Sequence, residues 1–127
     1  FTIDIRSPDI NKLEKMENEL RDMAIDICNK YKVTFEMDQI GGFDPVAFDK
    51  ECLDNIRNSA DKFGYSHKDI VSGAGHDACW INTVAPSAMV MCPCVDGLSH
   101  NEAEEIKPEW ASSSTNVMLH AAIASAT

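Results

Sequence analysis

The run Ala88-Met89-Val90-Met91-Cys92 decides the predicted fold. All five side chains are apolar, so a strand built from them would bury both of its faces. Such a strand is typical of a parallel sheet that is covered by helices, whereas a strand with one wet face alternates apolar and polar residues. The sequence therefore predicts an α/β layer in which residues 88–95 form a buried strand.

The first forty residues predict a β-α-β unit. Apolar and polar side chains alternate over residues 1–6 and again over residues 33–38, which is the period of a strand with one buried face. Between these two runs, the helix-start signal Ser7-Pro8-Asp9 opens an amphipathic helix that ends near Lys30.

A domain boundary is predicted at Gly41-Gly42, because Gly41 to Pro45 form the strongest turn signal in the chain. Downstream of it the pattern again alternates helices with strands. Helices are predicted over residues 48–63 and 76–84 and from Pro108 onward, with a short strand over residues 69–72.

Charge and composition exclude two classes of partner. The 127 residues carry a net charge of −10. Nucleic acids and anionic membrane surfaces both require a positive field, so we expect neither as a partner. No apolar run reaches the roughly 20 residues of a membrane-spanning helix, and residues 1–6 do not read as a signal peptide. Five irregularly spaced cysteines fit buried thiols in a reducing compartment, so we expect a cytoplasmic protein.

Two histidines follow turn-forming sequences and are candidates for a site. His100 follows Gly97-Leu98-Ser99, beyond the carboxyl end of the predicted buried strand, where α/β sheets collect ligands. Three nearby glutamates favour a divalent metal there, and the alternative is a surface histidine in an acidic loop. His76 follows Gly73-Ala74-Gly75 and opens a predicted helix, where it either contacts an anionic ligand or is a half-buried helix residue.

Arg6 ends the first predicted strand, on the face opposite its apolar side chains. A guanidinium binds a carboxylate through two parallel hydrogen bonds, so Arg6 is a candidate for holding an acidic ligand. The alternative is a solvated arginine that pairs with Asp4 or Asp9.

Several expected motifs are missing from the sequence. A metal hydrolase needs at least three protein ligands, yet no His-x-x-x-His pair occurs. The sequence also lacks a Gly-x-Ser-x-Gly elbow, a P-loop and the Gly-x-Gly-x-x-Gly form of the dinucleotide-binding fingerprint.

Four stretches, in their order and separation, resemble the C-terminal part of the N-carbamoyl-amino-acid amidohydrolases. This group comprises N-carbamoyl-L-amino acid hydrolase, β-ureidopropionase and allantoate amidohydrolase, within the aminoacylase- and carboxypeptidase-like metallohydrolases. The stretches are Phe1 to Asp9, Gly73-Ala74-Gly75-His76-Asp77-Ala78, the apolar run into Pro93, and Gly97-Leu98-Ser99-His100-Asn101-Glu102-Ala103-Glu104.

The resemblance implies two domains and three site roles. Residues 1–43 would be the second half of a lid or dimerisation domain, and residues 44–127 the C-terminal segment of the catalytic domain. By the same resemblance, His100 would be a metal ligand, Gly75 and His76 would contact the substrate, and Arg6 would hold its carboxylate.

The resemblance also implies a reaction. Two divalent ions, zinc or manganese, would activate water against the carbamoyl carbon of an N-carbamoyl amino acid, releasing the amino acid, CO2 and ammonia. The family acts as a homodimer on such small molecules. The family's catalytic glutamate and other metal ligands would lie upstream of Phe1, so we expect this chain alone to be an inactive fragment.

Three alternatives stay open. The first is an allantoate amidohydrolase, which shares the motifs. The second is a peptidase or aminoacylase relative. The third is a non-catalytic dimerisation or interaction module, retained for its β-α-β unit.

Overall fold

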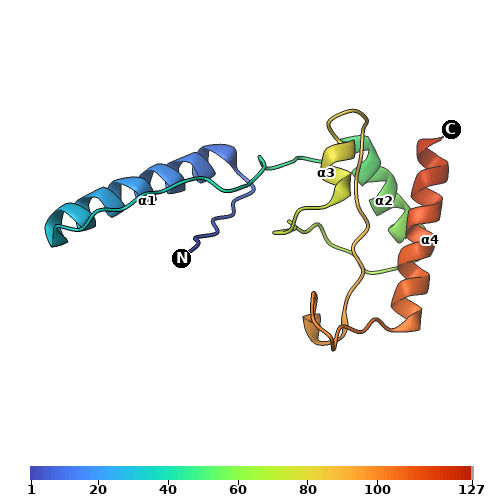
Figure 1. Cartoon of the computed structure of the whole chain (residues 1–127). Coiled ribbons are helices and arrows are strands. Elements are labelled where there is room, and N and C mark those ends of the chain that lie inside the picture. The colour runs from blue at the N-terminus through green and yellow to red at the C-terminus, as the bar shows by residue number, and fades with distance from the viewer. Residues whose placement is uncertain (127) are drawn as a thin grey trace. The chain divides into compact units, whose positions relative to one another are not determined.

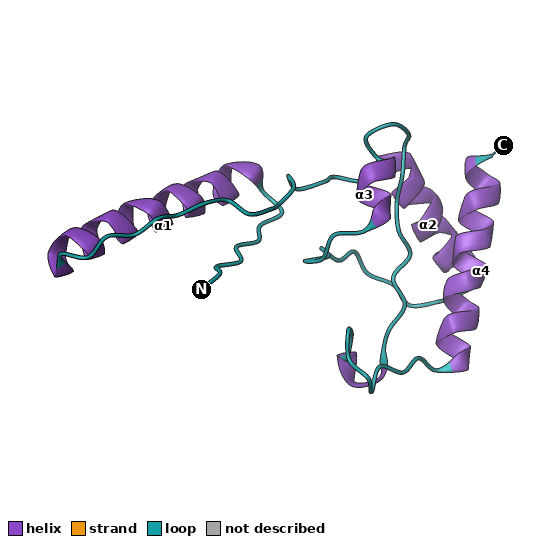
Figure 2. Ribbon diagram, in the orientation of Figure 1, coloured by secondary structure: helices purple, strands orange, loops and turns teal. Residues whose placement is uncertain are grey.

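The computed structural model describes residues 1–126, and its regular structure is helical (Figures 1 and 2). The helices are α1 (Ile10–Tyr31), α2 (Lys50–Lys62), α3 (Asp77–Ile81), a 3-10 turn at Val95–Gly97, and α4 (Pro108–Ser125). The four predicted helices are therefore present, with α3 ending three residues earlier than its pattern indicated.

Helix α1 begins and ends on local signals. The Asp9 carboxylate accepts hydrogen bonds from the backbone N–H groups of Asn11, at 2.9 Å, and Lys12, at 3.3 Å. These bonds satisfy two of the donors that a helix start leaves unpaired. At the other end Lys32 adopts a left-handed conformation, and its N–H donates to the Cys28 carbonyl. None of the residues of α1 is buried.

Helices α2 and α4 pack against each other and form the core of their part of the chain (Figure 1). The buried apolar residues are small: Ala60 on α2, and Val117 and Ala121 on α4. Ser59 is buried beside them, and its hydroxyl donates to the Asn55 carbonyl at 2.7 Å. Small side chains let two helix backbones approach closely, which explains why alanine and serine occupy this contact.

The predicted strands are not confirmed as regular structure. Among residues 1–126 no strand is formed, and residues 1–6, 33–38, 69–72 and 88–92 are loops (Figure 2). The predicted β-α-β unit is therefore not found. Residues 88–90 are only half-buried and Met91 is exposed, so the central run is not covered on both faces either.

The strand predictions rested on the alternation of apolar and polar side chains. Such alternation indicates a face suited to burial, but a strand also needs a second backbone to supply its hydrogen bonds. Among the described residues, the backbone hydrogen bonds outside the helices include none between residues 1–6 and 33–38. A strand without a ladder leaves its N–H and C=O groups to water, and two strands alone are marginally stable.

The chain divides into two compact units. Within the described residues, the first comprises residues 1–47 with 71–74, and the second comprises residues 48–70 with 75–126. The assignment of residues 1–43 to a lid domain and 44–127 to a catalytic domain stays a prediction. None of the helices in residues 1–126 combines the length and apolar character needed to cross a membrane.

Candidate functional site

Arg6 lies in the first unit with its guanidinium held on two sides. Its Nε donates to both carboxylate oxygens of Asp4 at 3.1 Å, and its Nη2 donates to Asp4 Oδ2 at 2.5 Å. Its Nη1 donates to the carbonyl oxygen of Gly73 at 2.5 Å. The side chains of Arg6 and Asp4 are 61% and 60% exposed.

The ion pair shifts both pKa values toward the charged forms. The hydrogen bonds from Arg6 hold the pKa of Asp4 below its ordinary value, and those to Asp4 raise the pKa of Arg6. The pairing with Asp4 is the alternative that the sequence offered for Arg6. The predicted contact with a substrate carboxylate stays a prediction, and it requires Arg6 to serve a second partner.

Gly75 and His76 lie in the second unit at the start of α3. Gly75 is exposed and His76 is half-buried. The backbone of His76 is extended, with φ −135° and ψ 154°, and its carbonyl accepts a hydrogen bond from the Cys79 N–H at 2.9 Å. His76 therefore lies at the junction between an extended segment and helix α3, and the sequence had predicted a helix start at this residue. Its role in substrate contact stays a prediction.

His100 is presented by a closed loop in the second unit. The loop is tied at its base by the Val95 N–H, which donates to the Glu105 carbonyl at 2.8 Å. His100 has a φ of 56°, the left-handed region, and its N–H donates to Glu104 Oε2 at 2.8 Å. Histidine is among the non-glycine residues enriched there, although such conformations carry some strain. The residue is exposed, which leaves its role as a ligand open to test.

Glu104 is a residue of this loop whose role the sequence did not reveal. Its Oε1 accepts from the Cys94 thiol at 3.6 Å while its Oε2 holds the His100 backbone. Burial first, and the Glu104 carboxylate second, raise the pKa of Cys94. The sequence had placed Glu104 only among nearby carboxylates, and four-residue spacing within a loop does not indicate such a bond.

The described residues do not form a metal site by themselves. Among residues 1–126 no three His, Cys, Asp or Glu side chains gather closely enough to hold an ion. An imidazole such as that of His100 is a suitable ligand for zinc or manganese, but a metal centre needs at least three protein ligands. That His100 supplies one ligand, with the others lying outside this chain, stays a prediction.

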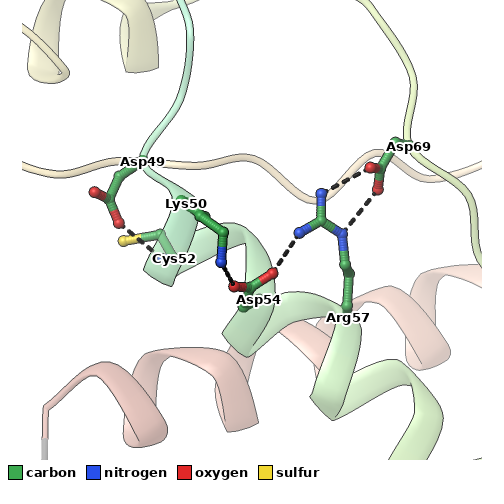
Figure 3. A network of polar contacts seen from close by, with 6 residues as sticks. All are labelled: Asp49, Lys50, Cys52, Asp54, Arg57 and Asp69. Atoms are coloured by element: carbon green, nitrogen blue, oxygen red, sulfur yellow. Dashed lines mark hydrogen bonds and ion pairs between the residues drawn. The ribbon is translucent and has the colours of Figure 1, made fainter.

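A charge network on α2 was also missed by the sequence reasoning (Figure 3). Arg57 donates to both oxygens of Asp69, from Nε at 3.1 Å and Nη2 at 2.7 Å, and to Asp54 Oδ1 from Nη1 at 2.5 Å. These bonds lower the pKa of Asp69 and raise that of Arg57. The network ties Asp69, in the segment after α2, to Arg57 on the helix.

Comparison with known proteins agrees with the motifs. The family model described as Peptidase family M20/M25/M40 matches residues 3–124. The chain is similar to an N-carbamoyl-L-amino-acid amidohydrolase of Rhizobium meliloti, with 51% identity over 99% of the chain and 30% of the relative. It is also similar to an allantoate amidohydrolase of Escherichia coli (strain K12), with 30% identity over 82% of the chain and 25% of the relative.

Solved structures share this fold. A hydantoinase/carbamoylase family amidase from Burkholderia multivorans superposes with a TM-score of 0.85 at 49% identity, over 91% of this chain and 28% of that one. The chain thus spans less than a third of the length of each of these relatives.

Proposed function

Because the chain belongs to the Peptidase family M20/M25/M40, we propose that it is part of a metal-dependent amidohydrolase that cleaves the carbamoyl C–N bond of N-carbamoyl amino acids. The observation that carries the proposal is the 51% identity to an N-carbamoyl-L-amino-acid amidohydrolase along nearly the whole chain. The products would be the free amino acid and carbamate, which falls to CO2 and ammonia.

Each predicted site residue has a task that its chemistry suits. The guanidinium of Arg6 would hold the substrate carboxylate, since planar N–H pairs match carboxylate oxygens. Gly75 leaves room for the substrate to approach the backbone, and His76 would donate a hydrogen bond to it. His100 would contribute one imidazole to the metal centre. Fixing the carboxylate end would set which carbon reaches the reacting water.

The metal centre itself would need further ligands. Since the described residues hold no cluster of three ligand side chains, the proposal places the others, together with the proton-accepting glutamate, upstream of Phe1. We therefore expect the chain alone to hydrolyse little or no substrate. Homodimer formation and a cytoplasmic location remain further predictions.

The proposal is tested by assaying the full-length protein for ammonia release from N-carbamoyl amino acids, with and without a chelator. We expect activity that the chelator abolishes and that added zinc or manganese restores. His100→Ala should lower the metal content per protomer, measured by atomic absorption, while His67→Ala should not. Activity that survives the chelator would refute metal dependence.

Allantoate is the second candidate substrate, because the chain is 30% identical to an allantoate amidohydrolase. The lower identity favours the carbamoyl amino acid. Comparing kcat/KM for the two substrates in the same preparation decides between them. A folded full-length protein without either activity would favour a non-catalytic module, and sedimentation would then show whether it dimerises.

A further inference from the structure

The hydrogen bonds of Arg6 use only part of its donor capacity. A guanidinium carries five N–H groups, one on Nε and two on each terminal nitrogen. Asp4 takes the Nε–H and one Nη2–H, and the Gly73 carbonyl takes one Nη1–H. Two N–H groups remain, and they belong to the two different terminal nitrogens.

Gly73 approaches the guanidinium from the flank that faces the side-chain stem. A Cβ built on Gly73 would lie 3.9 Å from Arg6 Nη1 and 4.0 Å from Arg6 Cδ. Asp4 occupies the opposite flank, formed by Nε and Nη2. None of the hydrogen bonds given for Arg6 among the described residues bridges Nη1 and Nη2, and the two N–H groups on the edge between these nitrogens point in parallel.

We propose that Asp4 is a positioning residue, which with the Gly73 carbonyl fixes the Arg6 guanidinium so that its outer edge receives the substrate carboxylate. This inference rests on the proposed function and adds to it a residue and a backbone group with a defined task. A parallel N–H pair matches the two oxygens of a carboxylate, and an already ordered fork loses less freedom on binding.

Asp4 also carries a charge of the same sign as the proposed ligand, which works against binding. Both side chains of the pair are mostly exposed, so water and salt screen that repulsion. The ordering of a long, flexible side chain is not screened. We therefore expect positioning to outweigh repulsion, so that loss of the Asp4 carboxylate weakens substrate binding.

The test uses the full-length protein and the variants Asp4→Asn, Asp4→Glu and Arg6→Lys. Asp4→Asn should raise KM for an N-carbamoyl amino acid about three- to tenfold, the size of the ordering cost of one side chain, with kcat within about twofold. Asp4→Glu keeps the negative charge, so its KM should lie between the wild-type value and that of Asp4→Asn. Arg6→Lys should raise KM at least as much, because lysine offers no planar fork.

A substrate analogue separates positioning from general damage. For the same N-carbamoyl compound with its carboxylate converted to a carboxamide, Asp4→Asn should leave KM unchanged. The matched control is Asp22→Asn, which removes an exposed carboxylate on α1. This variant should change KM for neither the carboxylate substrate nor the carboxamide. Circular dichroism checks that each variant folds, and Asp4→Ser replaces Asp4→Asn if that variant does not.

The outcomes of these assays test the role of Asp4 separately from the proposed carbamoyl hydrolase activity. A wild-type protein without carbamoyl hydrolase activity overturns both. An active wild type in which Asp4→Asn leaves KM unchanged or lowers it overturns the inference alone, since Asp4 would then be neutral toward binding or compete with the carboxylate. An equal rise in KM for the carboxamide would assign Asp4 a merely structural role.

Discussion

Cys52 shows how a helix cap controls the chemistry of a neighbouring side chain. Asp49 caps α2 by accepting a hydrogen bond from the Cys52 N–H at 2.9 Å (Figure 3). Burial is the first cause that raises the pKa of the Cys52 thiol, followed by Asp49 and then by the charge of Glu51. A raised pKa leaves less thiolate at a given pH, and the thiolate is the reactive form.

We predict that Asp49→Ser makes Cys52 more reactive. Serine is as good a cap as aspartate, so α2 should stay folded while the negative charge is lost. The pKa of Cys52 should fall part of the way, because burial remains. The measurement is the pH profile of iodoacetamide labelling at Cys52, read by peptide mass spectrometry. Glu51→Gln should move the profile less, and an unmoved profile in Asp49→Ser would contradict the prediction.

Helix α1 depends on its ends more than on its surroundings. None of its residues is buried, so its stability comes from caps and from pairs along its surface, such as Arg21 with Glu17 at 3.1 Å. At its C-terminus Lys32 has a φ of 56°. A lysine there is strained, whereas glycine adopts this conformation readily and is the usual residue at such ends.

We predict that Lys32→Gly stabilises α1 by about 0.5–1 kcal/mol. Lys30→Gly is the matched control, because Lys30 lies within the helix and glycine there should cost about 1 kcal/mol. Helicity measured by circular dichroism at 222 nm during thermal melting should rise in the first variant and fall in the second. Loss of helicity in both would show that the end of α1 is not left-handed in solution.

The molecule buries little apolar surface for its length. Its buried apolar residues in the described range are Ala60, Val117 and Ala121, while large side chains such as Trp80 and Val84 are exposed. Polar links therefore matter more than usual in the second unit. The bidentate pair of Arg57 and Asp69 joins α2 to the segment that follows it.

We predict that this link is lost in acid. The pKa of Asp69 is lowered by Arg57, so the pair stabilises the folded state above the ordinary carboxyl pKa of about 3.9. Its contribution should begin to fall below about pH 4 and vanish below the lowered pKa. Asp69→Asn should be less stable than wild type at pH 7, and the difference should disappear in acid. Urea unfolding between pH 2 and 7 measures it, with exposed Asp38→Asn as the control; a difference that persists in acid would contradict the prediction.

The positions where helices begin could be predicted from the sequence. The start of α1 at Ser7-Pro8-Asp9 and the start of α4 at Pro108 follow from capping and from the backbone of proline, which act over a few residues. The family followed from motifs around His76 and His100, which the comparisons confirmed. Their roles in binding remain predictions.

The sequence by itself determined the helices, the acidic charge and the family, because each depends on neighbouring residues or on composition. Only the tertiary structure decided which groups meet across long separations. Arg6 contacts Gly73, 67 positions away in the sequence. Arg57 contacts Asp69, beyond the end of its helix, in addition to Asp54 on the same helix. It also decided that the alternating runs remain loops in residues 1–126, because a strand exists only where a distant backbone supplies its hydrogen bonds.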